Sequence, residues 1–160
     1  MTATNPPGTP WIVEQHWDLT YRHAADPVAA TFFRTLRDEG RLLGKRCDAC
    51  GRVLMPPRPF CDRDYQATGE WVEVGSTGAI ELFTIMYHRI QGLPEPPYAI
   101  AYVTPDGADT ALVNFVRGVD LEDRETALRQ LAIGSRVAIE VETQRSGRMT
   151  DFFFRVQDGR

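Results

Sequence analysis

Three cysteines and one aspartate impose the strongest constraint on this chain. They follow the pattern C-x2-C-x10-C-x2-D, formed by Cys47, Cys50, Cys61 and Asp64. A spacing of two residues lets one tight turn direct two ligands at the same ion, and the glycine after Cys50 lets the backbone fold back toward the sulfur. The pattern therefore predicts a pair of knuckles that hold one structural zinc ion.

The fourth zinc ligand has alternatives. An aspartate oxygen binds zinc at distances similar to those of other ligands, so three thiolates and Asp64 make a closed tetrahedral site. Asp62 or one of the three histidines (His16, His23 and His88) are the alternative ligands. The competing interpretation is a loop with buried thiols and no metal. The proline-rich run over residues 55–59 predicts an extended return strand between the knuckles, because it cannot form a helix.

The rest of the chain predicts a mainly β protein. Asp26 and Pro27 are typical of the start of a helix, and Gly40 of its end, so we expect a helix over residues 27–39. After residue 69, apolar runs between turns predict five or six strands and one helical insertion, an order typical of an OB-type Greek-key barrel. The predicted organisation is an N-terminal arm with the helix (1–40), a rubredoxin-like zinc ribbon (41–68) and the barrel (69–160).

The apolar side chains of the helix and of the arm before it can be buried in two ways. One is that the helix packs on its own domain. The other is that these side chains face a partner chain, because the arm is too apolar to be left in water. The candidate interface residues are Trp11, Trp17, Phe32, Phe33 and Leu36.

Charge and composition exclude several classes of protein. The formal net charge is −4, and the acidic excess lies after residue 68, where the chain has no lysine. Such a segment repels a phosphate backbone, which disfavours nucleic-acid binding by the barrel. No apolar run approaches the length of a membrane span, and the first residues do not resemble a signal sequence. Three cysteines cannot form a disulfide framework, so we expect a cytoplasmic protein with reduced thiols.

The sequence contains no recognisable catalytic constellation. Its three serines, Ser76, Ser135 and Ser146, each lie beside a glycine in a predicted turn, and no nucleophile-elbow or phosphate-loop pattern is present. A free-standing zinc enzyme would need an open coordination position, which four protein ligands would not leave. We therefore expect no catalytic residues and a helper without activity of its own.

Together, the knuckles, the proline bridge and the barrel resemble a known family. The chain is similar to the small zinc-ribbon/OB-fold proteins encoded beside thiolases. The resemblance rests on four motifs in the same order: a helix ending in Glu39-Gly40-Arg41, Cys47-x-x-Cys50-Gly51, a Pro-Pro-Arg-Pro-x-Cys run ending at Cys61, and a Trp71-x-x-Val74 strand expected to open the barrel. That family is known as domain of unknown function family 35. Asp64 stands where the family usually has a fourth cysteine.

The resemblance implies an accessory subunit of a thiolase-superfamily partner that acts on CoA thioesters. The implied chemistry is thiolysis, acyl transfer or retro-aldol cleavage, in a heterotetramer of two subunits of each kind. The alternative function is a single-stranded nucleic-acid module, since zinc ribbons and OB folds both recur there.

CoA carries several negative charges, so a CoA site is expected in the locally basic stretch of the ribbon. The candidate residues, with Arg58 preferred, are Lys45, Arg46, Arg52, Arg58 and Arg63. The alternative is that these charges offset the negative charge of the metal site. The loop over residues 90–98 is a second candidate for contact with a partner or with the pantetheine arm.

Overall fold

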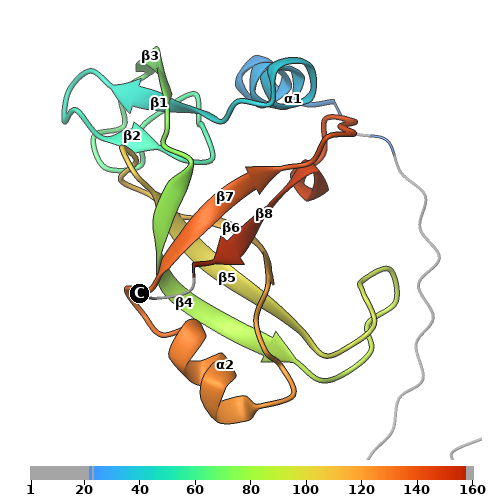
Figure 1. Ribbon diagram of the computed structural model, residues 1–160. Helices are drawn as coiled ribbons and strands as arrows, with labels where there is room; N and C mark the ends of the chain where they lie inside the picture. Colours follow the sequence, from blue (N-terminus) through green and yellow to red (C-terminus); the bar gives the residue numbers. More distant parts are fainter. Residues whose placement is uncertain (1–21, 23, 158–160) are drawn as a thin grey trace, which may run out of the picture.

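A computed structural model describes residue 22 and residues 24–157, and it confirms a mainly β architecture. Figure 1 shows helix α1 and a small sheet at one end of a closed barrel, and helix α2 at the other end. No helix among the described residues is long and apolar enough to cross a membrane. The predicted interface residues Trp11 and Trp17 and the histidines His16 and His23 lie outside the described residues.

Helix α1 (Pro27–Glu39) has the predicted bounds because its end signals are local. The Asp26 carboxylate accepts hydrogen bonds from the amides of Val28 and Ala29 at 2.8 and 3.1 Å. Gly40 ends the helix in the left-handed conformation, with φ 69° and its amide bonded to the Leu36 carbonyl.

The ribbon is an antiparallel sheet of three strands in the order β2-β1-β3. These strands are β1 (Leu43–Cys47), β2 (Val53–Leu54) and β3 (Thr68–Glu73). The strand around Trp71, expected to open the barrel, instead pairs with β1, with Trp71 opposite Lys45. β3 therefore crosses the boundary expected after residue 68. The expected return strand over residues 55–59 is also wrong: β2 ends at Leu54, and these residues form bends and irregular backbone, since proline lacks the amide that a strand needs.

The barrel is closed, in the strand order β4-β5-β6-β8-β7. Its strands are β4 (Thr77–Met86), β5 (Tyr98–Pro105), β6 (Leu112–Arg117), β7 (Arg136–Val141) and β8 (Phe152–Val156). β6 and β8 run parallel, while the other neighbouring pairs are antiparallel. α2 (Arg124–Gln130) lies between β6 and β7, and a short 3-10 helix, η1 (Met149–Asp151), precedes β8. This order confirms the predicted OB-type barrel.

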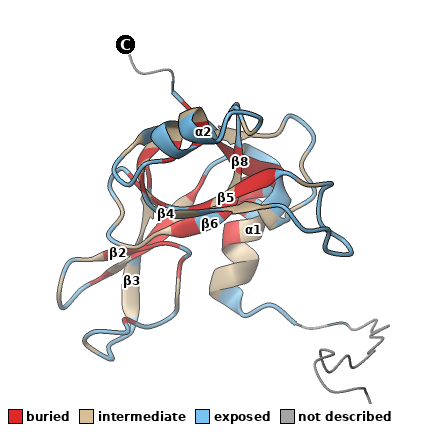
Figure 2. Ribbon diagram, turned by 90° about the horizontal axis from the view of Figure 1, so that it is seen from below, coloured by how far each residue is buried: buried red, intermediate tan, exposed pale blue. Residues whose placement is uncertain are grey.

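One hydrophobic core joins the helix, the ribbon and the barrel. Phe32 and Leu36 of α1 are 2% and 0% exposed and belong to the same buried cluster as Met55 of the ribbon and Phe154 of the barrel. Figure 2 shows this buried material on the barrel strands. Phe32 and Leu36 therefore do not form a partner-facing surface, because this chain itself covers them. Phe33 is half-buried against the same cluster.

Removing Leu36 from this core should lower the stability of the whole chain. We expect Leu36→Ala to reduce the free energy of unfolding by about 2–5 kcal/mol, the usual effect of deleting a fully buried leucine side chain. The measurement is equilibrium urea denaturation followed by tryptophan fluorescence. Leu128→Ala is the matched control, because Leu128 is also helical but 43% exposed; equal losses in the two variants would contradict the placement of α1.

Candidate metal centre

Two knuckles with the same backbone geometry form the site. In the first, the amide of Gly51 donates to the Cys47 carbonyl at 2.9 Å, and the amide of Cys47 donates to the Arg52 carbonyl at 2.8 Å. In the second, the amide of Tyr65 donates to the Cys61 carbonyl at 3.0 Å, and the amide of Cys61 donates to the Gln66 carbonyl at 2.8 Å. The second knuckle therefore has the same geometry as the first, with each residue fourteen positions later in the chain.

This repeat places Asp64 at the position that Cys50 has in the first knuckle. Tyr65 then corresponds to Gly51, and both have positive φ, 54° and 76°. A tyrosine is strained in this conformation, so its presence shows how strongly the knuckle geometry is imposed. The sequence contained this signal, since C-x2-C-G and C-x2-D-Y align residue by residue, but the role of Tyr65 was not predicted.

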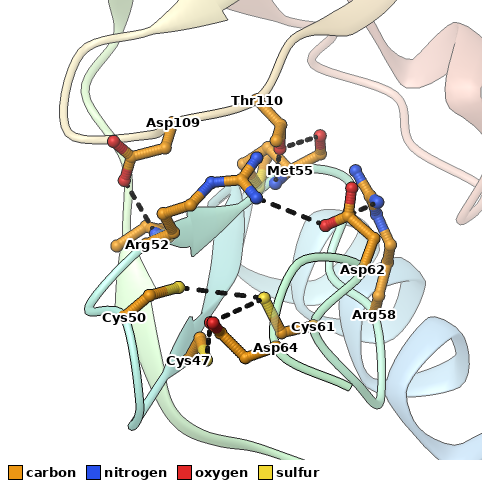
Figure 3. Close-up of polar contacts among 11 residues, drawn as sticks. Cys47, Cys50, Arg52, Met55, Arg58, Cys61, Asp62, Asp64, Asp109 and Thr110 are labelled. Carbon is orange, nitrogen blue, oxygen red and sulfur yellow. Dashed lines mark hydrogen bonds and ion pairs between the residues drawn. The ribbon is translucent and has the colours of Figure 1, made fainter. Parts of the chain in front are cut away.

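Three of the distances between the four donor atoms are those expected around a tetrahedral zinc ion. The Cys50 and Cys61 sulfurs are 3.8 Å apart, and the Asp64 Oδ2 atom is 3.5 Å from the sulfurs of both Cys47 and Cys61 (Figure 3). Zn–S bonds of about 2.3 Å and a Zn–O bond of about 2.0 Å at tetrahedral angles give ligand separations of about 3.8 and 3.5 Å. All four donor atoms lie within 4.8 Å of one another. The donor set fits a closed structural zinc site in which the ion cross-links the two knuckles.

Hydrogen bonds among these side chains shift their pKa values. The contact with Asp64 raises the pKa of the Cys50 thiol to about 12, and the same contact lowers the pKa of the Asp64 carboxyl. Burial acts to raise the pKa of Cys61, but backbone amides of Asp64 and Arg63 donate to its sulfur and lower that pKa overall. Metal binding must displace the thiol protons, so the affinity for zinc should fall as the pH is lowered.

The two alternative fourth ligands that the structure describes, Asp62 and His88, lie elsewhere. The Asp62 carboxylate points to two arginines: its Oδ1 atom is 3.4 Å from Nη1 of Arg52 and 3.5 Å from Nη1 of Arg58. Figure 3 shows both ion pairs. His88 is exposed beyond the end of β4, in the loop before β5. Among the described residues, Asp64 is the carboxylate brought to the sulfurs.

The basic residues predicted to bind CoA have different environments. Lys45 is 8% exposed, its ammonium lies 4.9 Å from the centre of the Trp71 ring, and it donates to the Gly69 carbonyl. The expectation that Lys45 binds CoA is therefore wrong, since strand pairing buries its side chain. Arg46 pairs with Glu70 at 3.3 Å, while Arg63 is exposed and has no ion pair among the described residues.

The match to known families follows the order of the structural units. Residues 34–64 match the ChsH2 rubredoxin-like zinc ribbon domain, and residues 71–142 match the ChsH2 C-terminal OB-fold domain. The two matches together cover more than half of the chain. The chain belongs to the ChsH2 family of DUF35 proteins.

Solved structures similar to this ChsH2-family chain share its fold. One is a chain of the Ltp2-ChsH2(DUF35) aldolase, with 24% identity and a TM-score of 0.62, covering 84% of this chain and 98% of that one. Another is a DUF35-family protein of unknown function from Sulfolobus solfataricus, with 20% identity and a TM-score of 0.60, covering 82% and 86%. A search of curated proteins gives no significant match.

Cobalt(II) substitution tests the ligand set directly, because sulfur-to-cobalt charge-transfer absorption increases with the number of thiolate ligands. We expect the wild-type chain to show a three-thiolate spectrum, Asp64→Cys a stronger four-thiolate spectrum and Cys61→Ser a weaker one. Asp64→Ala should hold the metal less tightly in competition with a chelator, because it opens the tetrahedron.

Asp62→Ala is the matched control, since this neighbouring carboxylate is outside the cluster. Loss of metal from Asp62→Ala but not from Asp64→Ala would contradict the assignment of the fourth ligand.

Proposed function

We propose that this ChsH2-family chain is an accessory subunit of a thiolase-like partner that cleaves a carbon–carbon bond in a CoA thioester, with retro-aldol cleavage as the favoured reaction. The observation that carries the proposal is the likeness, over 84% of this chain and 98% of the other, to a chain of the Ltp2-ChsH2(DUF35) aldolase. The two ChsH2 domain matches in the same order support it.

The chemistry of the described residues supports an accessory role. All three thiols belong to the metal cluster, and within residues 24–157 no hydrogen bond joins a serine or cysteine to a histidine. The cluster has four protein ligands, which leaves no coordination position for a substrate. The proposed partner therefore supplies the catalytic groups, and this chain supplies binding surface.

The exposed arginines of the ribbon support a contact with the phosphates of CoA. Arg63 is exposed on the second knuckle, next to Asp64, and forms no ion pair with any described residue. The ion pairs of Arg46, Arg52 and Arg58 span 3.3–3.5 Å and involve partly exposed side chains, so each contributes at most about 1 kcal/mol and a phosphate can compete for the arginine. We propose Arg63 and Arg58 as the principal contacts, with Arg46 and Arg52 beside them.

The first test is recovery of the partner. The tagged full-length chain, isolated from its native host, should bring down a thiolase-superfamily protein in a complex of two subunits of each kind, with about one zinc per copy of this chain. Trp11→Ala/Trp17→Ala should lose the partner and keep the zinc, since we propose these side chains as partner contacts. Recovery of the chain alone would contradict the proposal.

Turnover by the purified complex identifies the reaction. A retro-aldolase cleaves a 3-hydroxyacyl-CoA into a carbonyl compound and a shorter acyl-CoA and consumes no free CoA, whereas a thiolase consumes one CoA for each bond cleaved. We expect cleavage by the complex without added CoA and none by this chain alone. A strict requirement for free CoA would replace the aldolase assignment with a thiolase assignment.

Kinetics of the same complex test the arginine contacts. Arg63→Ala should raise the KM for the CoA thioester by about tenfold at unchanged kcat, since a charge-assisted hydrogen bond contributes about 1.5 kcal/mol. The increase should shrink at high salt because exposed charges are screened. Arg129→Ala is the control, because this exposed arginine lies on α2 at the opposite end of the barrel; equal effects would remove Arg63 from the site.

A further inference from the structure

An open cleft whose walls include four aromatic side chains lies beside the start of β5. Its volume is about 340 Å³. Its walls are formed mainly by Pro94, Tyr98, Phe115, Arg117, Phe152 and Phe153. The Tyr98 and Phe115 rings meet edge to face, with centroids 5.7 Å apart. Its volume is at the lower end of the range for small-molecule sites, about 300–1,000 Å³.

The hydroxyl of Tyr98 is the unusual feature of the cleft. Tyr98 is 7% exposed, and its hydroxyl oxygen is buried without a hydrogen-bond partner among the described residues. A buried hydroxyl that has lost its water destabilises the protein unless another group satisfies it. Tyr98 is one of the residues that line the cleft, so a group that satisfies its hydroxyl can come from a molecule bound there.

The charge at the edge of the cleft is already balanced. The Arg117 guanidinium lies 3.6 Å from the centre of the Phe153 ring and pairs with Glu142 at 2.7 Å. Arg117 therefore lies against the Phe153 ring, and its charge is paired with Glu142. The lining of the cleft thus has no unpaired positive charge that would favour an anion.

From this geometry we propose that the cleft binds a small neutral ring compound that carries one carbonyl or hydroxyl oxygen. The rings lie against the aromatic walls, and the oxygen accepts a hydrogen bond from the Tyr98 hydroxyl. All the named walls belong to this chain, so the binding does not depend on the proposed partner or on the CoA contacts of the ribbon.

The test uses the full chain and prodan, a neutral naphthyl ketone whose fluorescence shifts to the blue in an apolar site. We expect saturable binding with a blue shift. Tyr98→Phe should weaken the binding by about fivefold, the effect of one neutral hydrogen bond. Tyr102→Phe is the matched control, because Tyr102 lies on the same strand but is 43% exposed, and it should bind prodan like the wild type.

Two results would overturn the proposal. One is the absence of saturable binding to the free chain, as expected if the cleft only receives a side chain of a partner. The other is an equal Kd for Tyr98→Phe and the wild type.

Thermal unfolding without prodan checks the premise. Tyr98→Phe should melt at or above the wild-type temperature, because it removes an unsatisfied hydroxyl and keeps the ring. A lower melting temperature would mean that the hydroxyl already has a partner in the free protein, and would also overturn the proposal.

Discussion

Hydrogen bonds between the edge of the ribbon and one loop of the barrel fix how the two units sit relative to each other. The Val53 amide donates to the Asp109 carboxylate at 2.8 Å, and the Asp109 amide donates to the Val53 carbonyl at 2.8 Å. The Met55 amide donates to the Thr110 hydroxyl, which donates in turn to the Met55 carbonyl, both at 2.7 Å. Figure 3 shows the side-chain contacts of Asp109 and Thr110 beside the metal cluster. The free edge of β2 is thus satisfied by the barrel, as a buried strand edge must be.

The ribbon depends on support from both sides because its own core is very small. The buried residues around the cluster are Cys47, Leu54 and Cys61, whereas Val53 and Met55 pack into the core of the barrel. A unit of this size needs a metal or a neighbouring domain to be stable. The zinc site proposed for the knuckles and the contact with the barrel therefore act on opposite faces of the same short hairpin. This explains why the knuckle geometry is kept even where it places a tyrosine in a left-handed conformation.

Features with local causes could be predicted from the sequence. The bounds of α1 follow from Asp26, Pro27 and Gly40, and the metal cluster follows from the spacing of its cysteines. The return strand expected over residues 55–59 failed for a local reason, its prolines, whereas the other errors involve contacts between residues distant in sequence. Trp71 pairs with β1 because of strand register, and that register also buries Lys45. A charge count along the chain could not reveal this, nor that Glu70 and Asp62 would pair with the arginines of the ribbon.

The sequence indicated one side of the aromatic cleft, because the candidate loop over residues 90–98 contains Pro94 and Tyr98, but it could not indicate the other walls, for a topological reason. Tyr98, Phe115 and Phe153 belong to three different strands, and they meet because β6 pairs with β5 on one side and with β8 on the other. Figure 1 places the loop before β5 on the side of the barrel away from the ribbon. The arginines proposed to contact CoA and the residues of the cleft therefore share no side chain, so substitutions in one set should leave the other unaffected. This separation agrees with the proposed accessory role, in which the chain holds molecules for a partner.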